Sequence, residues 1–226
     1  MSATISNTVR LPSGVEYDID RYGDYPLYST FHGIVNGVQT KRQCFNYIRG
    51  DTIPGTVGAI ATELDTNLDK ISKGVGYTEE MAIHGIAIQL PHRVAKQGEN
   101  PDIGLLSDLV EIIDKTYFHF DIQNKVYAEG TLDCFPFFGG LWGFTTLNQQ
   151  EYMNNGIPQS ASAKPLALPI HITGKSTIQA VLEFPNGALA LTNVGAIADN
   201  EDYKIRVWLL GVRSRYEGAT KGVESK

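Results

Sequence analysis

The sequence has no run of about 20 apolar residues, the length that a helix needs to span the hydrocarbon core of a bilayer. Its first ten residues, MSATISNTVR, contain neither a cluster of positive charges nor an apolar stretch, so we do not expect a signal peptide. Charged residues are scarce, at 19% of 226 residues, and the net charge is -6. A dedicated nucleic-acid binder usually carries a basic stripe, so this composition disfavours sequence-specific nucleic acid as a partner.

Cysteine is almost absent. The two that occur, Cys44 and Cys134, show no Cys-x-x-Cys spacing, which excludes a zinc site built from cysteines. We expect both to be buried free thiols, because nothing in the sequence directs the chain to an oxidising compartment. A disulfide between them stays open.

The sequence also lacks the motifs of common catalytic sites. Gly-Lys-Ser at residues 174–176 ends like a phosphate-binding loop, but Pro169 stands where that loop needs glycine. There is no Gly-x-Ser-x-Gly and no His-Glu-x-x-His, and the histidines share no metal-binding spacing. We therefore predict that the chain is not an enzyme and has no cofactor. The five histidines are His32, His84, His92, His119 and His171.

Two acidic segments are weak candidates for a structural calcium ion. Asp18 begins a segment that resembles a calcium-binding loop, but Tyr22 and Ser29 stand where two of the ligands are expected. The second segment is an acidic loop before the last predicted strand, which could hold calcium at a subunit contact or be an ordinary polar loop. Its candidate ligands are Asp199, Glu201 and Asp202.

A two-residue alternation of apolar and polar side chains is the dominant pattern. It covers residues 86–90, 118–122, 168–172, 178–184 and 205–209, and it predicts strands with one apolar face. Such strands pack as two antiparallel sheets.

Two stretches have helical spacing instead. One helix is predicted to start with Asn100 as its cap and Pro101 in its first position, and its apolar stripe runs from Ile103 to Ile113. We place Asp108 on the opposite, polar side of that helix. The second stretch, residues 56–72, has apolar residues at the spacing of one helical face; these are Ile60, Leu64, Leu68 and Ile71.

Together these patterns predict an all-β fold: a jelly-roll sandwich of two antiparallel sheets with one or two short helices in its loops. Long irregular connections such as residues 139–164 are typical of jelly rolls. We divide the chain into an N-terminal arm (1–15), an irregular region packing on the roll (16–80), one jelly-roll core (81–216) and a polar tail (217–226).

The most unusual stretch is residues 135–144, where five aromatic residues stand among three glycines. Glycine lets backbones approach closely, which suits a loop that crosses the mouth of a barrel, and aromatic residues anchor subunit interfaces. We favour packing plus interface, and an aromatic platform for sugars is the alternative. The interface candidates are Phe135, Phe137, Phe138, Trp142 and Phe144.

Several phrases carry a family resemblance. They are GAIATELDTNL (58–68), the strand around 83–90, IQNKVYAEG (122–130), FPFFGG (135–140), NGIP (155–158), PLALPI (165–170), AVLEFP (180–185) and IRVWLLGVR (205–213). In this order they resemble major capsid proteins of small tailless icosahedral phages, of the jelly-roll kind often found over an internal membrane. The resemblance lies in the order of the predicted elements and in these short sequence segments, over residues 56–215.

The resemblance implies a structural protein of the virion, made in the host cytoplasm and without catalytic residues. Its partners would be copies of itself, as a trimer or pentamer, then neighbouring capsomers, minor capsid proteins and an internal membrane. The first fifteen residues carry only Arg10 as a basic residue, so the inner face is expected to meet a membrane or proteins rather than nucleic acid. The alternative function is a carbohydrate-binding module with Trp142 in its platform. A cupin-like enzyme is a third interpretation, weakened by the scattered histidines.

Overall fold

The computed structural model describes most of the chain. The described residues are 8–10, 16–18, 22–24, 26–68, 80–90, 105–137, 140, 142–145, 151–154, 163–173, 176–185, 187–192 and 202–214. Within them the chain is mostly strand, with one α-helix and one short 3-10 helix.

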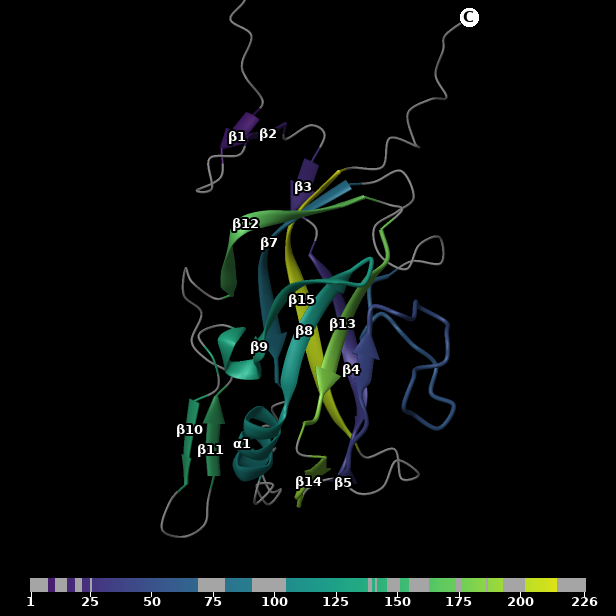
Figure 1. Ribbon diagram of the computed structural model, residues 1–226, viewed down its shortest axis with the longest axis vertical. Coiled ribbons are helices and arrows are strands. Elements are labelled where there is room, and N and C mark those ends of the chain that lie inside the picture. Colours follow the sequence, from purple (N-terminus) through teal and green to yellow (C-terminus); the bar gives the residue numbers. More distant parts are fainter. Residues whose placement is uncertain are drawn as a thin grey trace, which may run out of the picture.

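Two antiparallel sheets face each other (Figure 1). The first, which we call the β15 sheet, has the order β12 (Lys164–Thr173), β7 (Glu80–Gln89), β15 (Tyr203–Ser214) and β4 (Leu27–Ile34). A short strand, β3 (Tyr22–Asp24), pairs with the end of β15. The second, the β8 sheet, has the order β6 (Arg42–Cys44), β13 (Ile178–Glu183), β8 (Tyr117–Ile122) and β9 (Lys125–Thr131).

The strand pairing is nested. Of these eight main strands, the first pairs with the last (β4 with β15), the second with the seventh (β6 with β13), the third with the sixth (β7 with β12) and the fourth with the fifth (β8 with β9). This nesting is the winding of a jelly roll. The predicted fold class, an all-β jelly-roll sandwich of two antiparallel sheets, is confirmed.

The smaller elements lie at the two ends of the roll. A two-stranded sheet of β1 (Thr8–Arg10) and β2 (Glu16–Asp18) lies beyond the end at which β3 enters (Figure 1). The helix α1 (Leu105–Lys115), the pair of β5 (Gly37–Val38) and β14 (Ala188–Leu189), and the hairpin of β10 (Trp142–Thr145) and β11 (Glu151–Asn154) lie at the other end. The 3-10 helix η1 (Leu132–Cys134) follows β9. No helix of the described part is long and apolar enough to cross a membrane.

The core lies between the two sheets. Alternate residues of β8 and of β15 are fully or almost fully buried and belong to one apolar cluster, as the two-residue period of a strand requires. The alternation predicted for 118–122 and 205–209 is therefore confirmed, whereas in 178–184 Val181, which was predicted on the outward side, is buried as well. The inward rows of these two strands are Phe118, Phe120 and Ile122, and Ile205, Val207 and Leu209.

The prediction for residues 168–172 is wrong at Leu168, which is 80% exposed. The register between β12 and β7 shifts between Pro165 and Ile170, so the residues between them leave the ladder. Proline has no N–H to donate to a neighbouring strand, which favours such an interruption on an edge strand.

The helix α1 is confirmed, and Leu109 and Ile112 of its predicted apolar side are buried, but the prediction is wrong at two positions. Asp108 is buried and Val110 is about half-exposed. The reason is a polar contact: the Asp108 carboxylate accepts hydrogen bonds from the backbone N–H and the hydroxyl of Thr192, each at 2.9 Å. The predicted cap Asn100 and first residue Pro101 lie outside the described residues.

The second predicted helix is wrong in its described part, residues 56–68, which form turns and isolated bridges. Gly55 and Gly58 have positive φ values of 84 and 70, which a helix does not accept. The Asp65 carboxylate accepts the backbone N–H and hydroxyl of Thr62, a local bond that competes with helical hydrogen bonds.

The first two strands of the roll come from the region that we predicted to be irregular, residues 16–80. The roll begins at Leu27, because β4 and β6 are the edge strands that pair with β15 and with β13. Polar Ser29 and Thr30 are both buried in β4, which hides its two-residue period. Both cysteines are free, but only Cys44 is buried as predicted; Cys134 is exposed.

Candidate functional site on the outer face of the β15 sheet

The outer face of the β15 sheet carries polar and aromatic side chains in register. In the β4–β15 ladder Tyr28 stands opposite Trp208, and Thr30 stands opposite Arg206. Side chains of a strand alternate between its two faces, so the intervening residues Ser29 and Val207 point inward and are buried. The two chain segments thus present one continuous outer row.

Trp208 lies at the centre of this row. Its ring centroid is 4.9 Å from that of Tyr28 and 6.1 Å from that of Phe137, which stacks on it at an interplanar angle of 21°. The guanidinium of Arg206 lies 5.3 Å from the Tyr28 centroid and 5.6 Å from the Trp208 centroid. The indole N–H of Trp208 donates to Gln89 at 3.1 Å. The side chains around Trp208 are held in one arrangement by ring stacking, by cation–π contacts and by the hydrogen bond of the indole N–H.

We call residues 50–68 the strap. They run beside the edge of β4 that β15 leaves free, with an isolated bridge between Ser29 and Thr66. The side chain of Asn67 donates to the carbonyl of Pro26 at 2.7 Å and accepts from the backbone N–H of Tyr28 at 2.8 Å. The strap therefore covers an edge that would otherwise be open to pairing.

A buried histidine joins the strap to the roll. His32 of β4 lies between two carboxylates: its Nε2 is 3.1 Å from Asp65 Oδ1 of the strap, and its Nδ1 is 3.6 Å from Asp202 Oδ2, directly before β15. We call these three residues the clamp. Their side chains are 2%, 12% and 9% exposed for His32, Asp65 and Asp202.

Each carboxylate of the clamp is also held by hydrogen bonds of its own. Asp202 accepts the backbone N–H of Gly33 at 2.6 Å, and Asp65 accepts Thr62 at 2.8 and 2.9 Å. Burial acts to raise the pKa of Asp65, but the hydrogen bonds from Thr62 and the charges of His32 and Lys204 outweigh it, so that this pKa is lowered. The pair of carboxylates is thus anchored in position around the imidazole.

A cleft of about 360 Å³ opens beside the clamp. Arg206 crosses it and donates to the carbonyl of Leu64 and, at 3.4 Å, to the hydroxyl of Thr30. The cleft has two cations and one carboxylate in its wall and suits polar side chains of a partner. Its lining residues are Thr30, Leu64, Asp65, Gln89, Leu90, Lys204 and Arg206.

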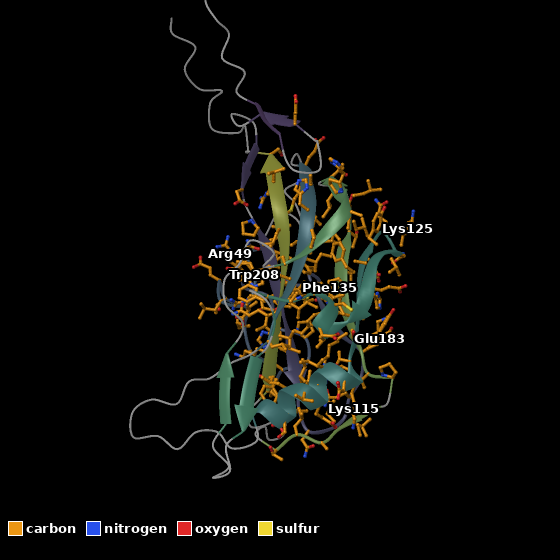
Figure 2. All side chains as sticks on the ribbon, turned by 90° about the vertical axis from the view of Figure 1, so that its left-hand side faces the viewer. Arg49, Lys115, Lys125, Phe135, Glu183 and Trp208 are labelled. Carbon is orange, nitrogen blue, oxygen red and sulfur yellow. The ribbon has the colours of Figure 1, made fainter. Side chains whose placement is uncertain are left out.

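Of the aromatic residues in the segment 135–144, only some lie at this site. Phe135 is fully buried in the core, edge-to-face with Phe118 at 4.9 Å, and Figure 2 shows it between the two sheets. Its backbone carbonyl accepts the N–H of Ile88 at 2.8 Å. Phe135 is therefore a packing residue and not the interface residue that we predicted. Phe137 reaches the outer face by stacking on Trp208, which Figure 2 shows on the outside of the sandwich.

The other predicted interface residues are not placed at the site. Trp142 and Phe144 lie on β10, in a hairpin apart from both sheets (Figure 1), and nothing is described of their side chains. Phe138 lies outside the described residues.

Only one of the acidic candidates is described. Asp202 belongs to the clamp, whereas Asp199 and Glu201 lie outside the described residues. Among the residues that the structure places, no group of three or more His, Cys, Asp or Glu is arranged to hold a metal ion. Calcium at this loop stays a prediction.

The exposed apolar side chains of the strap were not predicted from the sequence. Val57, Ile60 and Leu64 are 64%, 55% and 77% exposed, although large apolar side chains are usually buried. Other apolar residues of the strap, Ile53, Ala61 and Leu68, are buried in the core, so the strap carries both buried and exposed apolar side chains. The signals that could have revealed it are the glycines at 55 and 58 and the Thr62–Asp65 pair, because both oppose a helix.

No family model, curated protein or solved structure matches the chain. Its function must therefore be argued from the fold and the side-chain contacts.

Proposed function

We propose that the chain is a structural protein: a capsid subunit that assembles with copies of itself into the icosahedral shell of a tailless phage. The observation that carries this proposal is the strap. It is fixed along the edge of a jelly roll by hydrogen bonds, and it holds Val57, Ile60 and Leu64 exposed. Apolar side chains that are held exposed in this way are available for contact with a partner.

The fold supports a partner of the same kind. Jelly rolls are the subunits of many viral shells, and they also occur in lectins and cupins. Closed shells are built from symmetric contacts between identical chains, so one exposed surface is repeated in every copy. A trimer or pentamer that joins neighbouring capsomers would bury this surface many times over.

Burial of the exposed strap side chains would favour association. Full burial of a valine, leucine or isoleucine side chain stabilises by about 1.5–3 kcal/mol. Each strap has three such side chains, and two of them are more than 60% exposed. Much of the free energy of burying them is therefore still available for association with another subunit. Modest contacts of this kind suffice when each subunit makes several of them.

The carbohydrate-binding alternative has lost part of its predicted platform. Phe135 lies in the core and Phe137 is stacked on Trp208, so neither offers a free ring face of the kind that a sugar platform needs. We therefore keep the capsid function as the proposal, with the virion as its location and an internal membrane or minor capsid proteins as partners of the inner face.

The direct test is negative-stain electron microscopy of the purified chain at high concentration. Closed particles of uniform diameter, or regular trimers or pentamers, would support a shell subunit. Isolated monomers under every salt and pH condition would contradict it.

A further inference from the structure

The cleft beside the strap has two cations with hydrogen-bond donors to spare. Lys204 of β15 is exposed, and among the residues that the structure describes it has neither a hydrogen bond nor an ion pair. A guanidinium carries five N–H groups, and Arg206 uses two of them in its bonds to Leu64 and Thr30. The carboxylate in the cleft wall, Asp65, already accepts hydrogen bonds within the strap. The cleft, which we call the basic cleft, therefore suits a carboxylate from outside.

The basic cleft adjoins the exposed apolar part of the strap. Leu64 belongs to both, because it lines the cleft and is 77% exposed. Val57 and Ile60 are exposed on the same strap. A small free anion would leave these apolar side chains in water, whereas a protein surface with carboxylates could cover them while it neutralises the cations. The partner that fits is thus an acidic protein surface.

The outer face of the β8 sheet has the complementary charge. His119 of β8 lies between Asp121 at 2.8 Å and Glu183 at 3.5 Å, and Glu129 stands opposite His119 in the β8–β9 ladder. We call the carboxylates of Asp121, Glu129 and Glu183 the acidic face. They outnumber Lys41, which lies 3.1 Å from Glu183. Glu129 has no ion pair within the described part of the chain, so its charge is available to a partner.

The basic cleft and the acidic face lie on opposite sides of the sandwich. The guanidinium of Arg206 is 5.6 Å from the ring of Trp208. Figure 2 shows Trp208 on one outer side and Glu183 toward the other, with Phe135 of the core between them. The two surfaces of one chain therefore cannot meet each other, but a second copy can bring them together. Such a contact between different surfaces repeats from copy to copy and closes into a ring when the rotation allows it.

We propose that the basic cleft receives the acidic face of a neighbouring copy in a head-to-tail contact, in which Lys204 and Arg206 bind its carboxylates. The inference rests on the proposed function and deepens it, because it names the two surfaces that meet. The apolar strap side chains supply affinity, and the charges fix the orientation of the two copies. A closed head-to-tail contact gives a trimer or pentamer, whereas a contact between identical surfaces gives a dimer.

Cross-linking by a carbodiimide tests the contact in the wild type, because this reagent joins a lysine amine to a carboxylate only where the two touch. Full chains labelled with ¹⁴N and with ¹⁵N are mixed in equal amounts below the concentration of assembly and then concentrated. We expect peptides that join Lys204 to the acidic face and carry both labels. Assembled particles in which Lys204 is joined only to carboxylates of its own strap, Glu63 and Asp65, would overturn the proposal.

Charge reversal tests the same contact by association. Lys204→Glu and Glu129→Lys each place like charges together, so each should raise the concentration at which half of the chains are assembled by about tenfold. The double variant carries both reversals in every copy, so its charges are again complementary and it should assemble nearly as the wild type does. Damage to the fold would instead add up in the double variant. Light scattering over a concentration series measures assembly, and circular dichroism checks the fold.

Two control variants change neighbouring positions without opposing the contact. Lys125→Glu makes the β8 sheet more acidic, and Val126→Ser leaves every charge in place, so both should assemble as the wild type does. Single reversals that assemble as well as these controls, or a double variant weaker than both singles, would overturn the head-to-tail contact and leave the proposed function standing. A wild type that stays monomeric would contradict the proposed function itself. If a reversed variant does not fold, the cross-links of the wild type decide.

Discussion

The carboxylate of Asp108, on α1, accepts the hydroxyl of Tyr203, the first residue of β15, at 2.9 Å, and both side chains are buried. The same carboxylate accepts two bonds from Thr192. One acidic residue thus joins the helix to the end of the roll. This explains why the helix buries a charged position that an amphipathic pattern would assign to solvent.

Asp108→Ala should strongly destabilise the protein. The substitution removes the acceptor of the buried Tyr203 hydroxyl and of the part-buried hydrogen bonds from Thr192, which costs about 1–3 kcal/mol. The measurement is urea unfolding followed by circular dichroism. Asp114→Ala, at an exposed position of the same helix, should change the free energy of unfolding by no more than about 0.5 kcal/mol. Equal effects of the two substitutions would show that Asp108 is not such a junction.

Gly33→Ala should loosen the strap. Gly33 has a φ of 74, and a Cβ there would lie 2.5 Å from the carbonyl oxygen of Gly55 in the strap. Gly37→Ala is the matched control, because its φ is 99 but nothing lies within 4 Å of the added Cβ. Both carry the strain of a positive φ, about 1–2 kcal/mol.

Only Gly33→Ala also pushes the strap away, so limited proteolysis should cut within residues 50–68 faster in this variant than in Gly37→Ala. Similar cleavage rates in the two variants would contradict the close approach of strap and β4.

Acid should weaken the protein through Asp65. Its pKa is lowered in the folded state, so its contribution to stability is present above the ordinary pKa of aspartate, about 3.9, and is lost as the pH falls through the folded value. Asp65→Asn should therefore reduce stability at about pH 6 and flatten the loss between about pH 5 and about pH 3. Urea midpoints over this range measure both effects. A variant with the same acid profile as the wild type would argue against the role of Asp65.

How far the sequence predicts this protein depends on what each pattern reports. The strands at 118–122, 178–184 and 205–209 were predictable because each has one face in the core, and the period of two follows from that. The first strand of the roll, β4, could not be predicted in this way, because its inward-facing row contains the polar residue Ser29. Ser29 accepts the backbone N–H of Phe45, so a polar residue takes an apolar position.

The candidate site was harder to predict. Its clamp joins His32, Asp65 and Asp202, which are far apart in the chain, and only the winding of the roll brings them together. The strap was misread because Ile60, Leu64 and Leu68 have helical spacing. In the structure Leu68 is buried while Ile60 and Leu64 are exposed, so that spacing reports no common face.

We expect this jelly roll to assemble with itself through the strap. The most direct measurement is native mass by light scattering over a concentration series, for the wild type and for the double variant Ile60→Ser, Leu64→Ser. Val126→Ser, at another exposed apolar position, is the control. Since all three side chains are exposed, the variants should remain folded, which circular dichroism checks.

We predict that the wild type and Val126→Ser form a trimer, a pentamer or larger particles, and that the double variant stays smaller at the same concentrations. A wild type that stays monomeric at every concentration would contradict the account, and so would a double variant that assembles as well as the wild type.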